Sequence, residues 1–177
     1  MIWKTFFLIL IPSIAFAQDF EIEAKSLASD LKSSLMKNLS ERMTKDGIQE
    51  AIPFCQLNVM PIAKKAAGDR INKFEFGRTS HKLRNELNSP QSWIGPYLKE
   101  FQGRLKSEIK KEFLIHKLPD GKQVYIEPLY VQAQCLLCHG DNISENVKKK
   151  IDKLYPNDKA VGFRLNEFRG FIWVKEK

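Results

Sequence analysis

The sequence contains few cysteines, few histidines and only one short apolar run. Cysteine and histidine each occur three times among 177 residues. After residue 17, no stretch reaches the roughly 20 apolar residues that a membrane-spanning helix needs, so no transmembrane segment is expected there. Internal repeats and low-complexity linkers are also missing, and we therefore expect a single domain. No acid–base constellation of an enzyme stands out, so catalysis is not the first expectation.

The first 17 residues have the pattern of a secretory signal peptide. Lys4 supplies a positive start, residues 6–14 are apolar, and Ala15-Phe16-Ala17 is a small-x-small cleavage site. Pro12 interrupts the run, which is shorter than a membrane span. We predict a signal peptide over 1–17 and an exported mature domain over 18–177, located in a bacterial periplasm. An uncleaved N-terminal anchor is the alternative.

The net charge is positive. The formal charge is +8, and removal of Lys4 with the leader would leave +7. The excess is spread along the chain, and its short lysine clusters are typical of solvated helix faces. Nucleic acid is not an expected partner of an exported protein. The clusters could instead steer the domain toward an acidic redox partner or an anionic membrane surface, with at most peripheral membrane contact.

The most informative motif is Cys135-Leu136-Leu137-Cys138-His139. C-x-x-C-H is the attachment signature of c-type haem, whose two vinyl groups form thioethers with the two thiols. The adjacent histidine then offers a neutral imidazole nitrogen to the iron. The motif predicts one covalently bound haem c, held by Cys135 and Cys138 with His139 as the proximal ligand. Half of a zinc site and a redox C-x-x-C are the alternatives.

The third cysteine then lacks a disulfide partner. In an oxidising compartment an odd thiol needs either burial or a ligand to protect it. Cys55 shares one face of a predicted helix with apolar residues at positions 52, 59 and 62. It is therefore either a small core residue or a ligand, and a disulfide to Cys135 or Cys138 would break the haem motif.

The periodicities predict an α+β domain with an antiparallel sheet. Helices are expected over residues 19–44, 46–67 with an interruption or kink at Pro61, 89–110 beginning near Pro90 or Pro96, and from Ser144 through Leu154. Strands are expected over residues 72–78, in a hairpin of 113–118 and 123–131, and in a last hairpin of 160–165 and 170–174. Residues 79–89 form a long basic loop, and Arg84 in it could pair with haem propionates.

Several residues are candidates for the second axial ligand of the iron. These are Cys55, His81, His116, Met36, Met43 and Met60. From chemistry alone we rank Cys55 first, His81 second and a methionine third. His116 falls in a predicted strand, which favours a surface or hydrogen-bonded histidine.

Several motifs together resemble a family of exported single-haem c-type domains with a PAS-like fold, the Tll-type haem domain. The matching segments are Ala51-Ile52-Pro53-Phe54-Cys55, Pro61-Ile62-Ala63, Gly77-Arg78-Thr79-Ser80, Arg84-Asn85 with Asn88, Pro90 and Trp93, Cys135 to Gly140, Tyr155-Pro156 with Asp158-Lys159-Ala160 and Gly162, and Arg169-Gly170.

The resemblance implies a PAS-like antiparallel sheet flanked by long N-terminal helices and the C-x-x-C-H segment. It also implies His139 as the proximal and Cys55 as the distal iron ligand. Apart from the resemblance, Arg78 and Arg84 are our candidates for propionate contacts. Thiolate ligation would favour Fe(III) and a low potential. We expect low-potential electron transfer with a redox partner protein, or redox or gas (NO/CO) sensing through a signalling partner.

Overall fold

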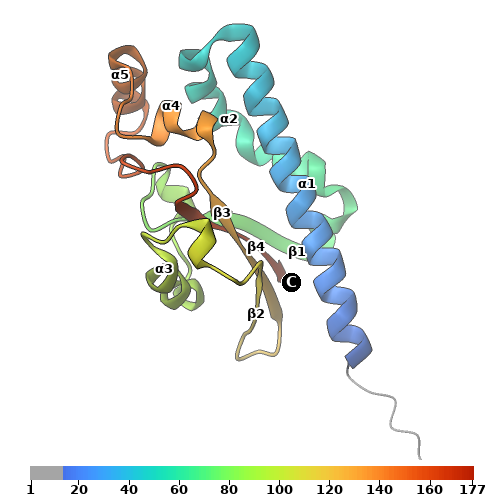
Figure 1. The fold of residues 1–177 in the computed structure, drawn as a ribbon. Helices are drawn as coiled ribbons and strands as arrows, with labels where there is room; N and C mark the ends of the chain where they lie inside the picture. The colour runs from blue at the N-terminus through green and yellow to red at the C-terminus, as the bar shows by residue number, and fades with distance from the viewer. Residues whose placement is uncertain (1–13) are drawn as a thin grey trace, which may run out of the picture.

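The chain builds two long helices beside a four-stranded sheet. The computed structural model describes residues 14–177, and its side chains except at 14–18 and 54–59. Helices α1 (Ile14–Asp46) and α2 (Ile48–Ala67) lie side by side along one flank of the molecule (Figure 1). Both predicted N-terminal helices are confirmed. Residues 1–13 of the predicted leader lie outside the described residues, and within residues 14–177 no helix is long and apolar enough to cross a membrane.

Helix α2 runs through Pro61 without interruption, so the interruption expected there is wrong, whereas a kink at this position stays a prediction. Proline cannot donate a hydrogen bond to the preceding turn, and its ring crowds the carbonyl four residues earlier. Packing after the proline offsets this cost, because Ala63 and Ala67 are buried against α1 beside Leu27 and Leu31. Tertiary contact therefore decides the course of this helix.

The sheet is antiparallel, with the order β1-β4-β3-β2. Its strands are β1 (Phe74–Thr79), β2 (Leu114–Lys117), β3 (Gln123–Tyr130) and β4 (Phe168–Glu176). The first predicted strand and the hairpin of β2 and β3 are confirmed, with the turn at Pro119-Asp120-Gly121. The predicted α+β class is therefore confirmed.

Alternate residues of the sheet face two different cores. Tyr125, Ile172 and Val174 pack under α1 and α2, whereas Val124, Ile126 and Phe171 pack with the short helix α3 (Gly95–Phe101). This is the period of two that a strand imposes on its side chains. The domain thus has three layers, long helices, sheet and a short helical segment (Figure 1).

The third helix is shorter than predicted and ends at Phe101 rather than near Lys110. A 3-10 turn over Ser92–Ile94 precedes it, and its start at Gly95 agrees with a beginning near Pro96. After Phe101 the backbone turns toward the segment that leads into β4. The Lys106 N–H donates to Asn166 O at 2.8 Å, and the Phe168 N–H donates to Arg104 O at 2.9 Å. These long-range bonds replace the intrahelical ones.

The last predicted hairpin is wrong, because residues 160–165 form no strand. Their backbone bonds go elsewhere: the Gly162 N–H donates to Gly140 O at 3.2 Å, and the Phe163 N–H donates to His139 O at 2.9 Å. The partner of this segment is therefore the end of the C-x-x-C-H motif. Only the second half of the predicted hairpin is a strand, within β4.

Three loops meet at one end of the sheet because neighbouring strands run antiparallel. Strand β1 ends at Thr79 and β3 ends at Tyr130, both near the start of β4 at Phe168. Helix α5 (Glu145–Leu154), which follows Ser144 as predicted, packs beside α2 at the same end (Figure 1). Residues 80–85, 131–140 and 155–167 therefore come together there.

Candidate functional site

The C-x-x-C-H motif folds as a single helical turn directly after strand β3. A 3-10 turn over Ala133–Cys135 continues into α4 (Leu136–His139). Residues three apart on a helix share a face, so the turn brings Cys135 and Cys138 to one side. Cys135 is a half-buried free thiol that accepts a hydrogen bond from the Gln132 N–H at 3.4 Å. Cys138 is also half-buried and packs against the cluster formed by α2 and α5.

His139 is held in one tautomer by the backbone. Its Nδ1 lies 2.7 Å from Ala160 O, and a carbonyl oxygen only accepts, so Nδ1 carries the proton. Nε2 of the neutral ring is then left with its lone pair. The pKa of His139 is lowered well below its ordinary value, first by burial and then by the charges of Arg169 and Arg84. The ring is therefore a neutral imidazole with a nitrogen available to a metal.

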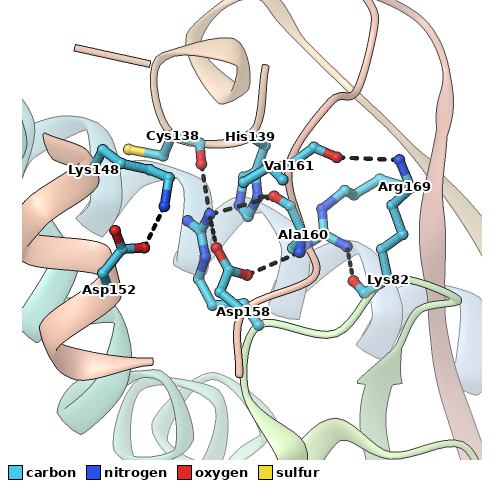
Figure 2. A network of polar contacts seen from close by, with 10 residues as sticks. Lys82, Cys138, His139, Lys148, Asp152, Asp158, Ala160, Val161 and Arg169 are labelled. Atoms are coloured by element: carbon cyan, nitrogen blue, oxygen red, sulfur yellow. Dashed lines mark hydrogen bonds and ion pairs between the residues drawn. The ribbon is translucent and has the colours of Figure 1, made fainter. Parts of the chain in front are cut away.

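Arg84 ties the loop after β1 to the helical turn. Its Nη2 donates to Cys138 O at 2.6 Å and pairs with Asp158 Oδ2 at 2.9 Å. The side chains are 12% and 5% exposed, so this is a buried ion pair. Figure 2 shows Asp158 and Ala160 lying between the segment of Cys138 and His139 and the loop that carries Lys82.

Arg169 is a site residue whose role we did not predict from the sequence. Its Nη1 donates to Ser80 Oγ at 2.9 Å and to Lys82 O at 3.3 Å, and its guanidinium lies 4.9 Å from the ring centre of Phe163. Burial and the charges of Arg78 and Arg84 lower its pKa to about 10. The only local signal was the Arg169-Gly170 pair, which assigns no role by itself.

Positive charge accumulates around His139. Arg78, an exposed residue near the end of β1, contributes to lowering the pKa values of both His139 and Arg169. Cys135 and then Asp158 act in the opposite direction and raise the pKa of Arg169, and Asp158 also pairs with Arg84. Three guanidinium groups therefore lie near His139, which is an electrostatic setting that suits anionic groups.

Two buried nitrogens near this charge have no hydrogen-bond partner among the described residues. They are His81 Nδ1 and Arg84 Nε, both from the loop after β1. The His81 ring stacks on Phe168 at 5.8 Å and meets Phe163 edge-on at 5.7 Å. Burial, followed by the charges of Lys82 and Arg169, lowers its pKa. Buried polar atoms are normally satisfied, so these two indicate a missing polar partner.

The structure places the other candidates for the second axial ligand in different surroundings. His116 lies on β2, where Nδ1 is 3.1 Å from the Tyr97 hydroxyl and the ring stacks on Trp93, as expected for a hydrogen-bonded histidine. Met60 is 51% exposed. Cys55 lies within α2, three residues after the buried Ile52, but its side chain is outside the described residues. Ile52 and Cys138 belong to one apolar cluster, which places this part of α2 beside the motif.

Comparison with known proteins agrees with this arrangement. Residues 16–176 match the protein family described as Tll0287-like. The crystal structure of the cyanobacterial heme-protein Tll0287 has the same fold, with a TM-score of 0.51 and 21% identity over 90% of this chain and 91% of that chain. This match supports the predicted PAS-like arrangement of the sheet. Curated proteins gave no match.

Proposed function

Because the chain belongs to the Tll0287-like family, we propose that it binds haem and acts as a periplasmic monohaem c-type cytochrome for low-potential electron transfer. The observation that carries this proposal is the state of His139, which directly follows two cysteines on one helical turn. Its Nδ1–H is engaged by Ala160 O, and its Nε2 retains a lone pair. That is the form of histidine that ligates haem iron.

The residues present fit haem in a second respect. Haem carries two propionate groups, and the site combines three guanidinium groups with two buried nitrogens, Arg84 Nε and His81 Nδ1, that have no hydrogen-bond partner in the described part of the chain. Arginine donors suit carboxylates because of their planar geometry and permanent charge. Arg78, Arg84 and the unpredicted Arg169 are the candidates for holding the propionates.

The roles that we propose follow from this fit. Cys135 and Cys138 would hold the porphyrin through thioethers, His139 would be the proximal ligand and Cys55 the distal ligand. When bound, the group supplies a one-electron Fe(III)/Fe(II) couple. A Cys55 thiolate would donate negative charge toward the iron, favour Fe(III) and lower the reduction potential. The redox partner would meet the protein in the periplasm after removal of residues 1–17.

Redox or gas sensing through a signalling partner is the second candidate function. The observation that favours it is the linkage of the site to α1. Helix α2, which carries Cys55, packs along α1, and α1 is also tied to the sheet by an ion pair between Lys32 and Glu127. Loss of the bond between Cys55 and the iron on reduction would therefore displace α2 against α1, a 33-residue helix that a partner could recognise.

Absorption and electron paramagnetic resonance spectra of the haem-loaded protein test the proposal. We expect the wild-type protein to show a low-spin ferric thiolate spectrum. Cys55→Ala should lose this spectrum and should have a higher midpoint potential than the wild type. His81→Ala is the matched control, because His81 is the second-ranked ligand, and it should keep the thiolate spectrum. An unchanged spectrum and potential in Cys55→Ala would contradict the ligand assignment, and a failure to bind haem at all would contradict the function.

The same preparation separates the two functions. Rapid electron exchange without a change of ligand favours electron transfer. Loss of the thiolate signal on reduction, followed by binding of CO or NO, favours sensing.

A further inference from the structure

The carbonyl oxygen of Ala160 is shared by two donors. It accepts from His139 Nδ1–H at 2.7 Å and from Arg84 Nη2 at 3.3 Å. An oxygen that also faces a cation has less electron density to offer its second donor. The strength of the bond at Nδ1 determines how basic the opposite nitrogen of an imidazole is. Arg84 is therefore placed to weaken the electron donation of His139 through a shared acceptor.

Asp158 fixes both sides of this contact. Its Oδ2 pairs with Arg84 at 2.9 Å. Its Oδ1 accepts the Ala160 N–H at 2.8 Å (Figure 2). One carboxylate thus positions the arginine and also the residue whose carbonyl the arginine contacts. Because both side chains are buried, their charges are weakly screened by solvent.

A propionate contact does not account for these bonds. Arg84 Nη2 already donates to Cys138 O, Asp158 Oδ2 and Ala160 O. Cys138 directly precedes His139 in the chain, and Ala160 O accepts the hydrogen bond from His139. Arg84 Nε is buried and has no hydrogen-bond partner among the residues that the structure describes. The Nη2 side of the guanidinium is therefore directed at the segment that holds the histidine.

We propose that Arg84 and Asp158 are positioning residues that set the reduction potential of the site through the His139–Ala160 hydrogen bond. The inference rests on the proposed function, because it assigns His139 to iron. The two residues act with opposite sign. Arg84 alone would favour the more reduced, less positive iron, and Asp158 alone would favour the oxidised one.

The test is the midpoint potential of the haem-loaded mature chain, measured for every variant in the same buffer. Asp158→Asn keeps an oxygen for the Ala160 N–H but leaves the Arg84 charge uncompensated, so the potential should rise. Arg84→Gln leaves the Asp158 charge uncompensated and gives Ala160 O to His139 alone, so the potential should fall. Each shift should change the Fe(III)/Fe(II) ratio at fixed poise about tenfold or more, which is roughly 59 mV for one electron.

Two further preparations act as controls. The double variant Arg84→Gln with Asp158→Asn restores electroneutrality and should return most of the way to the wild-type potential. The Arg70–Asp30 pair, with Nη2 2.6 Å from Oδ2, links α1 to the segment after α2, and the other hydrogen bonds of Arg70 go to Ser26, Ala66 and Ala67. Arg70→Gln and Asp30→Asn should therefore leave the potential unchanged.

A purely structural role predicts a different pattern. Loosening of the loop would move both single variants in the same direction and would lower their unfolding midpoints together. Shifts of the same sign, or none, would overturn the inference while leaving haem binding intact.

A readout without haem keeps the two proposals distinguishable. The ¹⁵N chemical shift of His139 Nδ1 in the full haem-free chain reports the strength of its bond to Ala160. We expect Arg84→Gln and Asp158→Asn to move it in opposite directions. If the wild-type chain takes up no haem, the proposed function fails and the effect on the potential fails with it. The shift then still decides whether Arg84 and Asp158 act on the His139–Ala160 hydrogen bond: shifts in one direction only, or none, overturn that step.

Discussion

Replacement of Gly170 by alanine should separate steric crowding from backbone strain. Gly170 lies in β4 at a φ of 148°, where side chains are rarely tolerated. A Cβ atom built there would lie 2.1 Å from Thr79 O and 3.1 Å from Ser80 Cα. The first distance is about 1 Å short of an ordinary contact, and the obstructing atom is backbone that cannot rotate away. Strands β1 and β4 would have to move apart at the point where the loop of His81 and Arg84 begins.

The expected loss of unfolding free energy in Gly170→Ala has two contributions. Placing a side-chain residue at an unfavourable positive φ costs about 1–2 kcal/mol. Overpacking typically adds about 1–3 kcal/mol, and a backbone clash belongs at the upper end. We therefore expect Gly170→Ala to lower the free energy of unfolding by roughly 3–5 kcal/mol, which is a large part of the stability of a typical domain.

Gly121→Ala is the matched control. Gly121 has a φ of 89° in the β2–β3 turn, and no atom lies within 4 Å of a Cβ built there. It carries the strain term alone, about 1–2 kcal/mol. Urea unfolding followed by tryptophan fluorescence measures both variants. Equal losses in the two would refute the role of the close approach, whereas a Gly170→Ala protein that fails to fold beside a folded Gly121→Ala would agree with it.

Three further predictions concern the site and its support. The pKa of His139 is lowered in the folded chain, so as pH falls from about 7 to 5 the unfolded chain takes up a proton that the folded chain does not. Haem-free protein should therefore lose at most about 1.4 kcal/mol of unfolding free energy per pH unit from this group. His139→Asn should reduce this pH dependence, as measured by urea titrations at several pH values. Ile151→Ala should cost about 2–5 kcal/mol in the same assay, because Ile151 is fully buried between α5 and α2, and a loss under 1 kcal/mol would contradict this packing. Replacing both Cys135 and Cys138 with serine should abolish the haem stain of the protein on a denaturing gel, and a persistent stain would contradict thioether attachment.

Elements with a strong local signal could be predicted from the sequence. Helix α1 follows from the recurrence of leucine every fourth residue, and Leu27 and Leu31 are buried as that pattern requires. The β2–β3 hairpin follows from alternation on both sides of a proline-glycine turn. These signals lie within short windows of sequence, so local propensity and periodicity are sufficient.

Elements that depend on distant partners could not be predicted. Residues 160–165 have the composition of a strand, yet their backbone bonds are made with residues 139 and 140. Helix α3 ends early because the following segment bonds to residues 166 and 168. In both cases a contact between segments far apart in the chain overrides the local preference.

The candidate site divides in the same way. The C-x-x-C-H motif is contiguous and could be read directly, whereas the role of Arg169 arises only when β4 brings it beside Ser80 and Phe163. Arg84 was expected to meet a propionate, and the structure additionally pairs it with Asp158. Cys55 as distal ligand stays a prediction, because its side chain lies outside the described residues.

The position of β4 bears on the timing of assembly. This strand lies between β1 and β3, although it is the last of the four to be synthesised. Until residues 168–176 are made, β1 has no neighbour in the sheet, and the sheet does not yet hold the loops after β1 and β3 at the same end. The thiols at 135 and 138 are therefore made well before the structure that encloses them. Any enzyme that must reach these thiols on an open chain has this interval in which to act, and substitutions that delay pairing of β4 would lengthen it.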